Sequence, residues 1–151
     1  MMIEYARATK DVAPPTRSNP SDAGLDVYAY LDEKPVTIGP GDNGVIPTGL
    51  RFGIPHGYML QVCNRSSMGA KRSLVVGAHI IDSGYDGEVF IDLHNIGHAP
   101  QLIEHGDKIA QLVMVPVVSF RAMESQTGNL YKWYPITISD RGDGSLGSTG
   151  Q

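Results

Sequence analysis

The sequence predicts an all-β domain, and two features of the chain support this prediction. Short runs of β-type residues recur along the chain, each bounded by glycine or proline. The 18 glycines and 10 prolines among 151 residues are spread along the chain instead of being collected in a linker. Short strands joined by regular turns produce this pattern, whereas long helices do not. We therefore expect one domain, built as a sandwich or barrel of short strands.

Six of these runs are expected to be strands. They cover residues 36–38, 44–46, 58–62, 74–76, 88–94 and 108–118. In the fifth run, Ile91 and Leu93 alternate with Asp92 and His94, which is the pattern of a strand with one buried face. The strongest helical expectation is one or two turns within residues 66–73.

Charge and cysteine content narrow the classes of protein. Twelve basic and sixteen acidic residues give a net charge of −4, whereas domains held on nucleic acid by bulk charge carry a basic excess. No apolar run approaches the roughly 18 residues of a membrane span, and no signal peptide is visible. The single cysteine, Cys63, cannot form an intramolecular disulfide. We expect a cytoplasmic protein with neither nucleic acid nor a membrane as partner.

Two segments carry groups suited to phosphate chemistry. Residues 64–69 combine the guanidinium of Arg65 with two hydroxyl groups, and such a turn can bind an anion. Asp82 follows two isoleucines and precedes a glycine-containing turn, which predicts a tight hairpin with Asp82 at the end of a buried strand. A carboxylate placed there can act as a general base. Taken alone, each segment is more often an ordinary turn than a functional site.

Five motifs in order give the chain a resemblance to the trimeric dUTP diphosphatases (dUTPases) over nearly its whole length. They are Asp22–Ala29, Arg65–Gly69, Ile81–Val89, Gly106–Val113 and a glycine-rich tail. The resemblance implies a jelly-roll-like β-barrel domain with an arm segment over residues 1–138. It implies a flexible tail over residues 139–151 that closes over an active site. It also implies a homotrimer with its active sites at the subunit interfaces.

The resemblance further implies a hydrolase of nucleotide metabolism that converts dUTP to dUMP and pyrophosphate with Mg²⁺. Asp82 would orient the attacking water, Tyr85 would pack under the deoxyribose, and Asp26 would reach Mg²⁺ through a water. The phosphates would be bound by Arg65, Ser66, Ser67, Gln111 and Arg141, with Gly147 and Ser148 closing on them. The uracil edge would be read by a hairpin from about Gly77 to Tyr85, including His79 and Ile81, and covered by Leu146.

Several positions depart from the family pattern and leave alternatives open. Leu146 replaces a phenylalanine that usually stacks on uracil, His79 replaces a usual glycine, and Asn64 stands where proline is common. Asp92 lies three residues before Asn95, where the related dCTP deaminases carry a catalytic glutamate. A deaminase-like or bifunctional enzyme is one alternative, and a weakly catalytic regulatory module on the same fold is another. The aromatic residues in 129–134 would pack the arm against a neighbouring subunit, offer a surface to a partner protein, or replace the missing stacking near the base.

Overall fold

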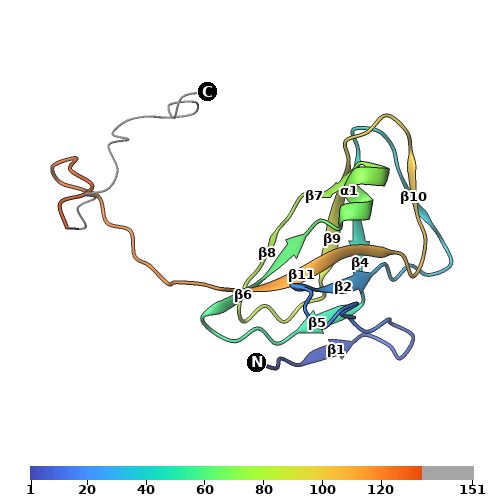
Figure 1. The fold of residues 1–151 in the computed structure, drawn as a ribbon, viewed down its shortest axis with the longest axis horizontal. Coiled ribbons are helices and arrows are strands. Elements are labelled where there is room, and N and C mark those ends of the chain that lie inside the picture. The colour runs from blue at the N-terminus through green and yellow to red at the C-terminus, as the bar shows by residue number, and fades with distance from the viewer. Residues whose placement is uncertain (134–151) are drawn as a thin grey trace. The chain divides into compact units, whose positions relative to one another are not determined.

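Antiparallel strands make up almost all of the regular structure in the part of the chain that is described. The structure, a computed structural model, describes residues 1–133 (Figure 1). The first of two structural units spans Met1–Ser119 and contains every strand and the one helix of the described residues. The elements are β1 (Tyr5–Arg7), β2 (Gly24–Tyr28), β3 (Val36–Ile38), β4 (Asn43–Pro47), β5 (Leu50–Phe52), β6 (Tyr58–Cys63), α1 (Ser66–Arg72), β7 (Leu74–Val76), β8 (Ile80–Ile81), β9 (Phe90–Asn95), β10 (Gln101–Ile103) and β11 (Lys108–Pro116). The all-β prediction is confirmed.

The strands form four sheets with a jelly-roll-like arrangement. The largest has the order β2-β11-β6-β8, and the second has the order β4-β9-β7. Two strand pairs, β1-β5 and β3-β10, complete the fold, and all pairs are antiparallel. Because neighbours in each sheet are distant in sequence, residues from separate motifs come to lie side by side.

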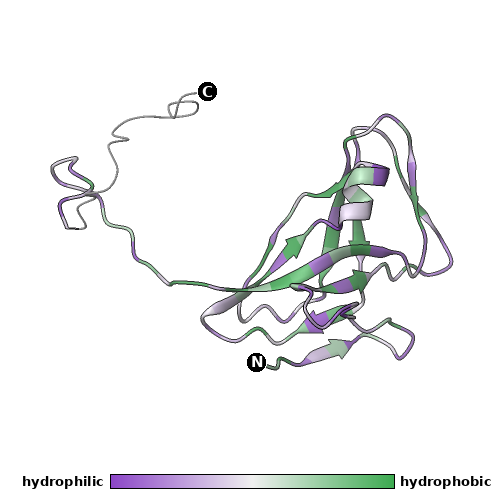
Figure 2. Ribbon diagram, in the orientation of Figure 1, coloured by the Kyte–Doolittle hydropathy of each residue, from purple (hydrophilic) through white to green (hydrophobic). Residues whose placement is uncertain are grey.

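A single apolar core is formed by alternate residues of the strands. On β9, Ile91 and Leu93 are buried while Asp92 and His94 are partly exposed, so the predicted period of two is confirmed. Asn95 shares the buried side, where its side-chain amide donates to the carbonyls of Ile38 and Ala99. Figure 2 shows the apolar stretches along the central strands that supply this core.

All six expected strands are present, and two of them, β3 and β7, have the expected bounds. The expected helical turns are present as α1, in which Met68 is buried and Ser73 ends the helix in a left-handed conformation with φ 53°. The strands β1, β2, β5 and β10 have no counterpart among the expected runs. Three of these four strands contain only three residues, too few to display a hydrophobic period.

Two expectations about the neighbourhood of Asp82 are wrong. Residues 77–85 do not fold back as a hairpin, because β7 pairs with β9 in one sheet and β8 pairs with β6 in another. The strand before Asp82 is not buried either, and Ile80 is 63% exposed. This strand has two residues and lies at the edge of its sheet, so it has a neighbour on one side only. The expected tight turn is present, since the Tyr85 N–H donates to the Asp82 carbonyl at 3.3 Å.

The second structural unit begins at Phe120, and its described part ends at residue 133. Residues 120–133 contain turns and neither a helix nor a strand. The tail residues with expected roles, Arg141, Leu146, Gly147 and Ser148, lie outside the described residues. Within residues 1–133, no helix has the length and apolar character needed to cross a membrane.

Candidate functional site

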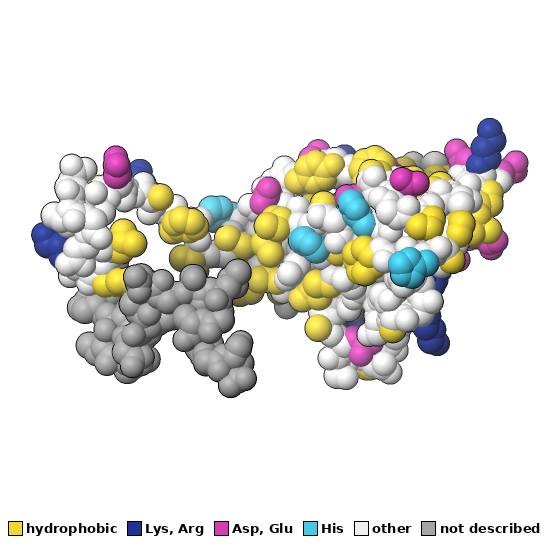
Figure 3. Space-filling view, turned by 90° about the horizontal axis from the view of Figure 1, so that it is seen from above, with side chains coloured by type: hydrophobic (Ala, Val, Ile, Leu, Met, Phe, Trp, Pro, Cys, Tyr) yellow, Lys and Arg dark blue, Asp and Glu magenta, His cyan; other side chains and the backbone are white. Residues whose placement is uncertain are grey.

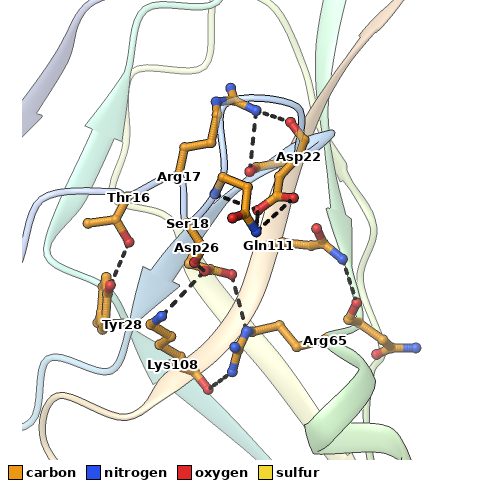
Figure 4. Close-up of polar contacts among 12 residues, drawn as sticks. Thr16, Arg17, Ser18, Asp22, Asp26, Tyr28, Arg65, Lys108 and Gln111 are labelled. Carbon is orange, nitrogen blue, oxygen red and sulfur yellow. Dashed lines mark hydrogen bonds and ion pairs between the residues drawn. The ribbon is translucent and has the colours of Figure 1, made fainter.

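Five of the residues expected to bind substrate or metal line one hollow of about 320 Å³. They are Asp26, Arg65, Ser66, Ser67 and Gln111, and Ser18 and Asp22 complete the lining. These residues come from the loop before β2, from β2, from the β6–α1 junction and from β11. Figure 4 shows Asp26 beside Ser18 and Arg65, with Asp22 and Gln111 nearby.

Strand register explains why these segments meet. Gln111 lies in the middle of β11, opposite Asp26 on β2 and opposite Cys63 on β6. Arg65 follows Cys63 by two residues, at the start of α1. Strands β2, β11 and β6 are adjacent in one sheet, so residues from three motifs that are far apart in the sequence lie beside one another.

Asp26 is the electrostatic centre of the hollow. The Arg65 Nε donates to its Oδ1 at 3.1 Å, and the Lys108 Nζ lies 3.6 Å from its Oδ2. The Ser18 hydroxyl donates to the same Oδ2 at 3.2 Å. The side chain of Asp26 is only 16% exposed, so these cations act on it with little screening by water. One carboxylate is therefore held between two cations, as Figure 4 shows.

The guanidinium of Arg65 is fixed between two strands. Besides the Nε contact with Asp26 on β2, its Nη1 donates to the Lys108 carbonyl on β11 at 3.4 Å. Its other terminal nitrogen, Nη2, takes part in neither contact. An arginine that is held through two of its three nitrogens in this way can present the remaining N–H groups to a phosphate in a defined direction.

No role was expected from the sequence for Ser18, Asp22 or Lys108. The loop carrying Ser18 is held together locally, since the Asn19 N–H donates to the Asp22 Oδ2 at 2.9 Å. The turn-forming residues Ser18–Asp22 were a signal for such a loop, and Lys108 lay within a recognised motif. Their approach to Asp26 depends on tertiary pairing, which no local pattern reveals.

A second hollow, of about 280 Å³, contains the expected catalytic residue. Its lining includes Ile81, Asp82 and Tyr85, together with Ile80, Glu88, Val89 and Phe90. None of these residues lines the hollow around Asp26. Within one chain, the expected site is thus divided between two separate hollows.

The ring of Tyr85 has a defined position in this second hollow. Its hydroxyl donates to the Glu88 carbonyl at 2.7 Å. The ring also occupies the space beside Gly87, where an added Cβ would lie 2.4 Å from the Tyr85 Oη and 2.6 Å from its Cζ. No side chain fits there without moving the tyrosine, so Gly87 permits the observed ring position.

The crossing segment at residues 77–79 joins the two larger sheets. The Gly77 N–H donates to the Asp92 carbonyl on β9 at 2.8 Å. At its other end, the Val62 N–H on β6 donates to the His79 carbonyl at 2.7 Å. The imidazole Nδ1 of His79 lies 3.3 Å from the Val62 carbonyl. His79 is therefore turned toward β6 through its ring and its main chain.

Asp92 belongs to a polar cluster on the partly exposed side of β9. The Asn43 Nδ2 donates to its Oδ1 at 2.8 Å, and the His94 Nε2 lies 2.9 Å from its Oδ2. The Asn43 bond and the His94 contacts lower the pKa of the Asp92 carboxyl below its ordinary value, against the opposing effect of burial. A Cβ at Gly77 would collide with Asp92 and His94, so the cluster packs directly against the crossing segment.

The lowered pKa predicts that ionised Asp92 stabilises the fold. Its pKa is lower in the folded than in the unfolded chain, so this contribution is present above about pH 4 and is lost as the pH falls through the folded pKa. We expect Asp92→Asn to reduce the free energy of unfolding at pH 7 more than at pH 3, measured by urea denaturation. Asp32→Asn, at an exposed position, is the control for removal of one charge. An effect of Asp92→Asn that is equal at both pH values would contradict this assignment.

Comparison with known proteins identifies the family. A family model described as dUTPase matches residues 10–150. The chain belongs to the dUTPase family. Among the relatives named deoxyuridine 5′-triphosphate nucleotidohydrolase, that of Desulfotalea psychrophila is 40% identical, with 95% of this chain and 91% of the relative covered. That of Gloeobacter violaceus is 39% identical, with 98% and 96% covered. The resemblance seen in the five motifs is confirmed.

Solved structures of the dUTPase family share the fold. A variant of the Staphylococcus bacteriophage 80alpha dUTPase with dUpNHpp has a TM-score of 0.81 and 25% identity, with 99% of each chain covered. A variant of the S. aureus phage phi11 dUTPase, described with a structural Mg(II) ion, has a TM-score of 0.75 and 25% identity. In that comparison 83% of this chain and 97% of the phage chain are covered. The expected jelly-roll-like dUTPase fold is confirmed.

Proposed function

We propose that this chain hydrolyses dUTP to dUMP and pyrophosphate in the presence of Mg²⁺. The observation that carries the proposal is the convergence of Arg65, Ser66, Ser67 and Gln111 with Asp26 in one hollow. In a member of the dUTPase family, this combination of cation, hydroxyl groups and amide suits a triphosphate. A triphosphate carries about four negative charges, and fixed donors directed at its oxygens stabilise the charge that develops during reaction.

The residues around Asp26 fit Mg²⁺ as the metal. Mg²⁺ prefers oxygen ligands, keeps several waters and is usually bound through one or two carboxylates together with substrate phosphates. Asp26 and Asp22 supply carboxylates in the hollow, and Ser18 supplies a hydroxyl. Among residues 1–133 there is no cluster of three or more His, Cys, Asp or Glu side chains suited to an all-protein metal cage. We assign Asp26 to a water-mediated contact with Mg²⁺, which would offset charge on the phosphate oxygens.

Asp82 is the proposed general base. It is exposed, it lies at the end of edge strand β8, and it lines the second hollow together with Tyr85. In the proposed reaction its carboxylate takes a proton from a water whose oxygen forms a bond to the α-phosphorus. The bond from that phosphorus to the bridging oxygen breaks, and its electron pair leaves with pyrophosphate. The uracil base of the substrate would be recognised by residues 77–81, which include Gly77, His79 and Ile81.

The proposed role of Tyr85 is to pack under the deoxyribose and exclude a ribose 2′-hydroxyl. Gly87→Ala should displace the tyrosine ring, because the added Cβ overlaps its hydroxyl group. We expect kcat/KM for dUTP to fall about tenfold or more, since small misplacements near a reacting centre have large effects on rate. The preference for dUTP over UTP should fall with it, measured as the ratio of the two kcat/KM values. Gly53→Ala is the matched control, because it lies outside both hollows and an added Cβ there has only the Glu4 carbonyl oxygen nearby, at 3.8 Å. An unchanged ratio in Gly87→Ala would exclude the role of Tyr85.

We also propose that the active enzyme is a homotrimer with its sites at subunit interfaces. The division of the site between two hollows supports this, because a neighbouring subunit can bring one hollow to the other. Exposed apolar side chains lie near the second hollow, including Ile80 and Phe90, and Val45 lies on the neighbouring strand β4. Figure 3 shows apolar side chains on one face of the surface. Burial of such side chains is a general driving force for association.

Residues 139–151 complete the proposed site as a tail that closes over bound nucleotide. Arg141 would contact the phosphates, Leu146 would cover the base, and Gly147 and Ser148 would approach the phosphate oxygens through their N–H groups. Main-chain N–H groups in glycine-containing segments can come close to phosphate oxygens because no side chain intervenes.

Product analysis tests the proposed function. The purified chain is incubated with Mg²⁺ and, separately, with dUTP, dCTP, dTTP or UTP, and nucleotides, pyrophosphate and ammonia are resolved. We expect dUMP and pyrophosphate from dUTP at a rate far above the hydrolysis of the other three nucleotides, and light scattering should report three chains per particle. Ammonia from dCTP would instead indicate a deaminase that uses Asp92, whose carboxylate is engaged by Asn43 and His94 in this structure. Turnover of none of the four would favour a regulatory module.

A further inference from the structure

Asn64 links three segments of the proposed site. It lies between the end of β6 and Arg65, at the start of the proposed phosphate-binding turn, which we define as residues 64–67. Its side-chain Oδ1 accepts a hydrogen bond from the Val76 N–H at 2.7 Å. Its main-chain carbonyl accepts from the Gln111 Nε2 at 3.0 Å. One residue thus touches the phosphate-binding turn, β11 and the end of β7.

The bond to Val76 determines where the crossing segment begins. Val76 is the last residue of β7, it is buried, and Gly77 directly follows it. A buried N–H needs an acceptor, and leaving it without one costs about 1–3 kcal/mol. The acceptor for the Val76 N–H is a side chain from the phosphate-binding turn. The next two contacts of the crossing segment, at Gly77 and His79, include main-chain hydrogen bonds to β9 and β6.

We propose that Asn64 is a positioning residue that couples phosphate binding at Arg65–Ser67 to base recognition at residues 77–81. The inference rests on the proposed function of these two segments. Asn64 is the neighbour of Arg65 in the chain, so any adjustment of Arg65 toward a phosphate is transmitted through the Asn64 carboxamide to Val76 and Gly77. The proline that the family pattern commonly has at this position offers no side-chain acceptor and could not make this link.

Amide chemical shifts in the NMR spectrum test the coupling without any need for turnover. Inorganic tripolyphosphate, which has no base or sugar, is added to the full chain with Mg²⁺. In the unmodified protein we expect the Ser66 and Ser67 amides to shift, and those of Val76 and Gly77 to shift with them. In Asn64→Ala, which keeps the carbonyl bonded by Gln111, the Ser66 and Ser67 responses should remain while the Val76 and Gly77 responses are lost. Asn64→Asp keeps an oxygen acceptor and should restore them.

Base selectivity is the second readout. We expect the ratio of kcat/KM for dUTP to that for dCTP to fall about tenfold in Asn64→Ala, the size expected for the loss of one hydrogen bond that holds a recognition segment. In Asn64→Asp the ratio should be kept, even where the added charge beside Arg65 raises KM for both substrates. A merely structural role would change both substrates in parallel and leave the ratio unchanged.

His105→Ala is the matched control. The Leu31 N–H donates to the His105 Nδ1 at 3.0 Å, so this variant also deprives a main-chain N–H of a side-chain acceptor, at a place outside both hollows. It should lower the melting temperature but leave the selectivity ratio and the tripolyphosphate shifts unchanged. The proposal is overturned if Val76 still responds to tripolyphosphate in Asn64→Ala, if it fails to respond in the unmodified protein, or if His105→Ala alters selectivity equally. Lack of dUTP hydrolysis by the unmodified protein would overturn the proposed function instead.

Discussion

Replacement of Asp82 by asparagine is expected to lower kcat for dUTP by about 10²- to 10⁴-fold, the usual contribution of a positioned general base. Asparagine has nearly the same shape but cannot take the proton from the attacking water. Asp82 is exposed and its turn is closed by a main-chain bond between Tyr85 and the Asp82 carbonyl, so the substitution leaves the local fold in place. Binding of dUMP, measured by calorimetry, should therefore be nearly unchanged.

The matched control for Asp82→Asn is Glu88→Gln. Glu88 lines the same hollow, and its contact with the Tyr85 hydroxyl uses the main-chain carbonyl, which the substitution does not alter. We expect kcat to change less than about twofold, because the removed carboxylate has no assigned part in proton transfer. Unchanged turnover in Asp82→Asn would remove Asp82 as the base. An equal loss of kcat in both variants would indicate that the total negative charge of the hollow, and not Asp82 in particular, determines the rate.

Arg65→Lys is expected to lower kcat/KM for dUTP by about 10²- to 10³-fold, although the charge is conserved. The guanidinium contacts Asp26 and the Lys108 carbonyl through different nitrogens and still has Nη2 to offer to a phosphate. A lysine ammonium is a single centre on a flexible stem and cannot hold these contacts in one plane. The variant therefore loses both the orientation of the phosphate contact and the support of Asp26.

Arg72→Lys provides the comparison for this second prediction. Arg72 also lies at an end of α1 and bonds a side chain, Gln101, through its Nε at 3.1 Å, but it lines neither hollow. Steady-state kinetics should show kcat/KM close to that of the unmodified protein, with any effect confined to the melting temperature. The Mg²⁺ concentration needed for half-maximal rate should rise in Arg65→Lys alone, because Asp26 loses the directed hydrogen bond from the Arg65 Nε that holds its carboxylate in place. An unchanged kcat/KM in Arg65→Lys would exclude an oriented phosphate contact by the Arg65 guanidinium.

The part of the fold that was predictable is the part encoded locally. Side chains alternate across a strand, so the burial of Ile91 and Leu93 beside the more exposed Asp92 could be inferred from their order alone. The prediction of a hairpin at residues 77–85 was wrong because the pairing of strands is not encoded locally. A run of two isoleucines before a glycine turn does not reveal which strand it pairs with, and here β7 and β8 join different sheets.

The candidate site shows the same difference between features encoded locally and features that depend on strand pairing. Five motifs in order were enough to indicate the family, and they pointed to Asp26, Arg65 and Gln111 as residues for phosphate and metal. The folded chain was needed to see that Lys108 and Ser18 share Asp26 with Arg65, that Asp82 occupies a separate hollow, and that Asn64 reaches Val76. Motifs record which residue types chemistry requires, whereas these contacts depend on pairing between strands that are distant in the chain.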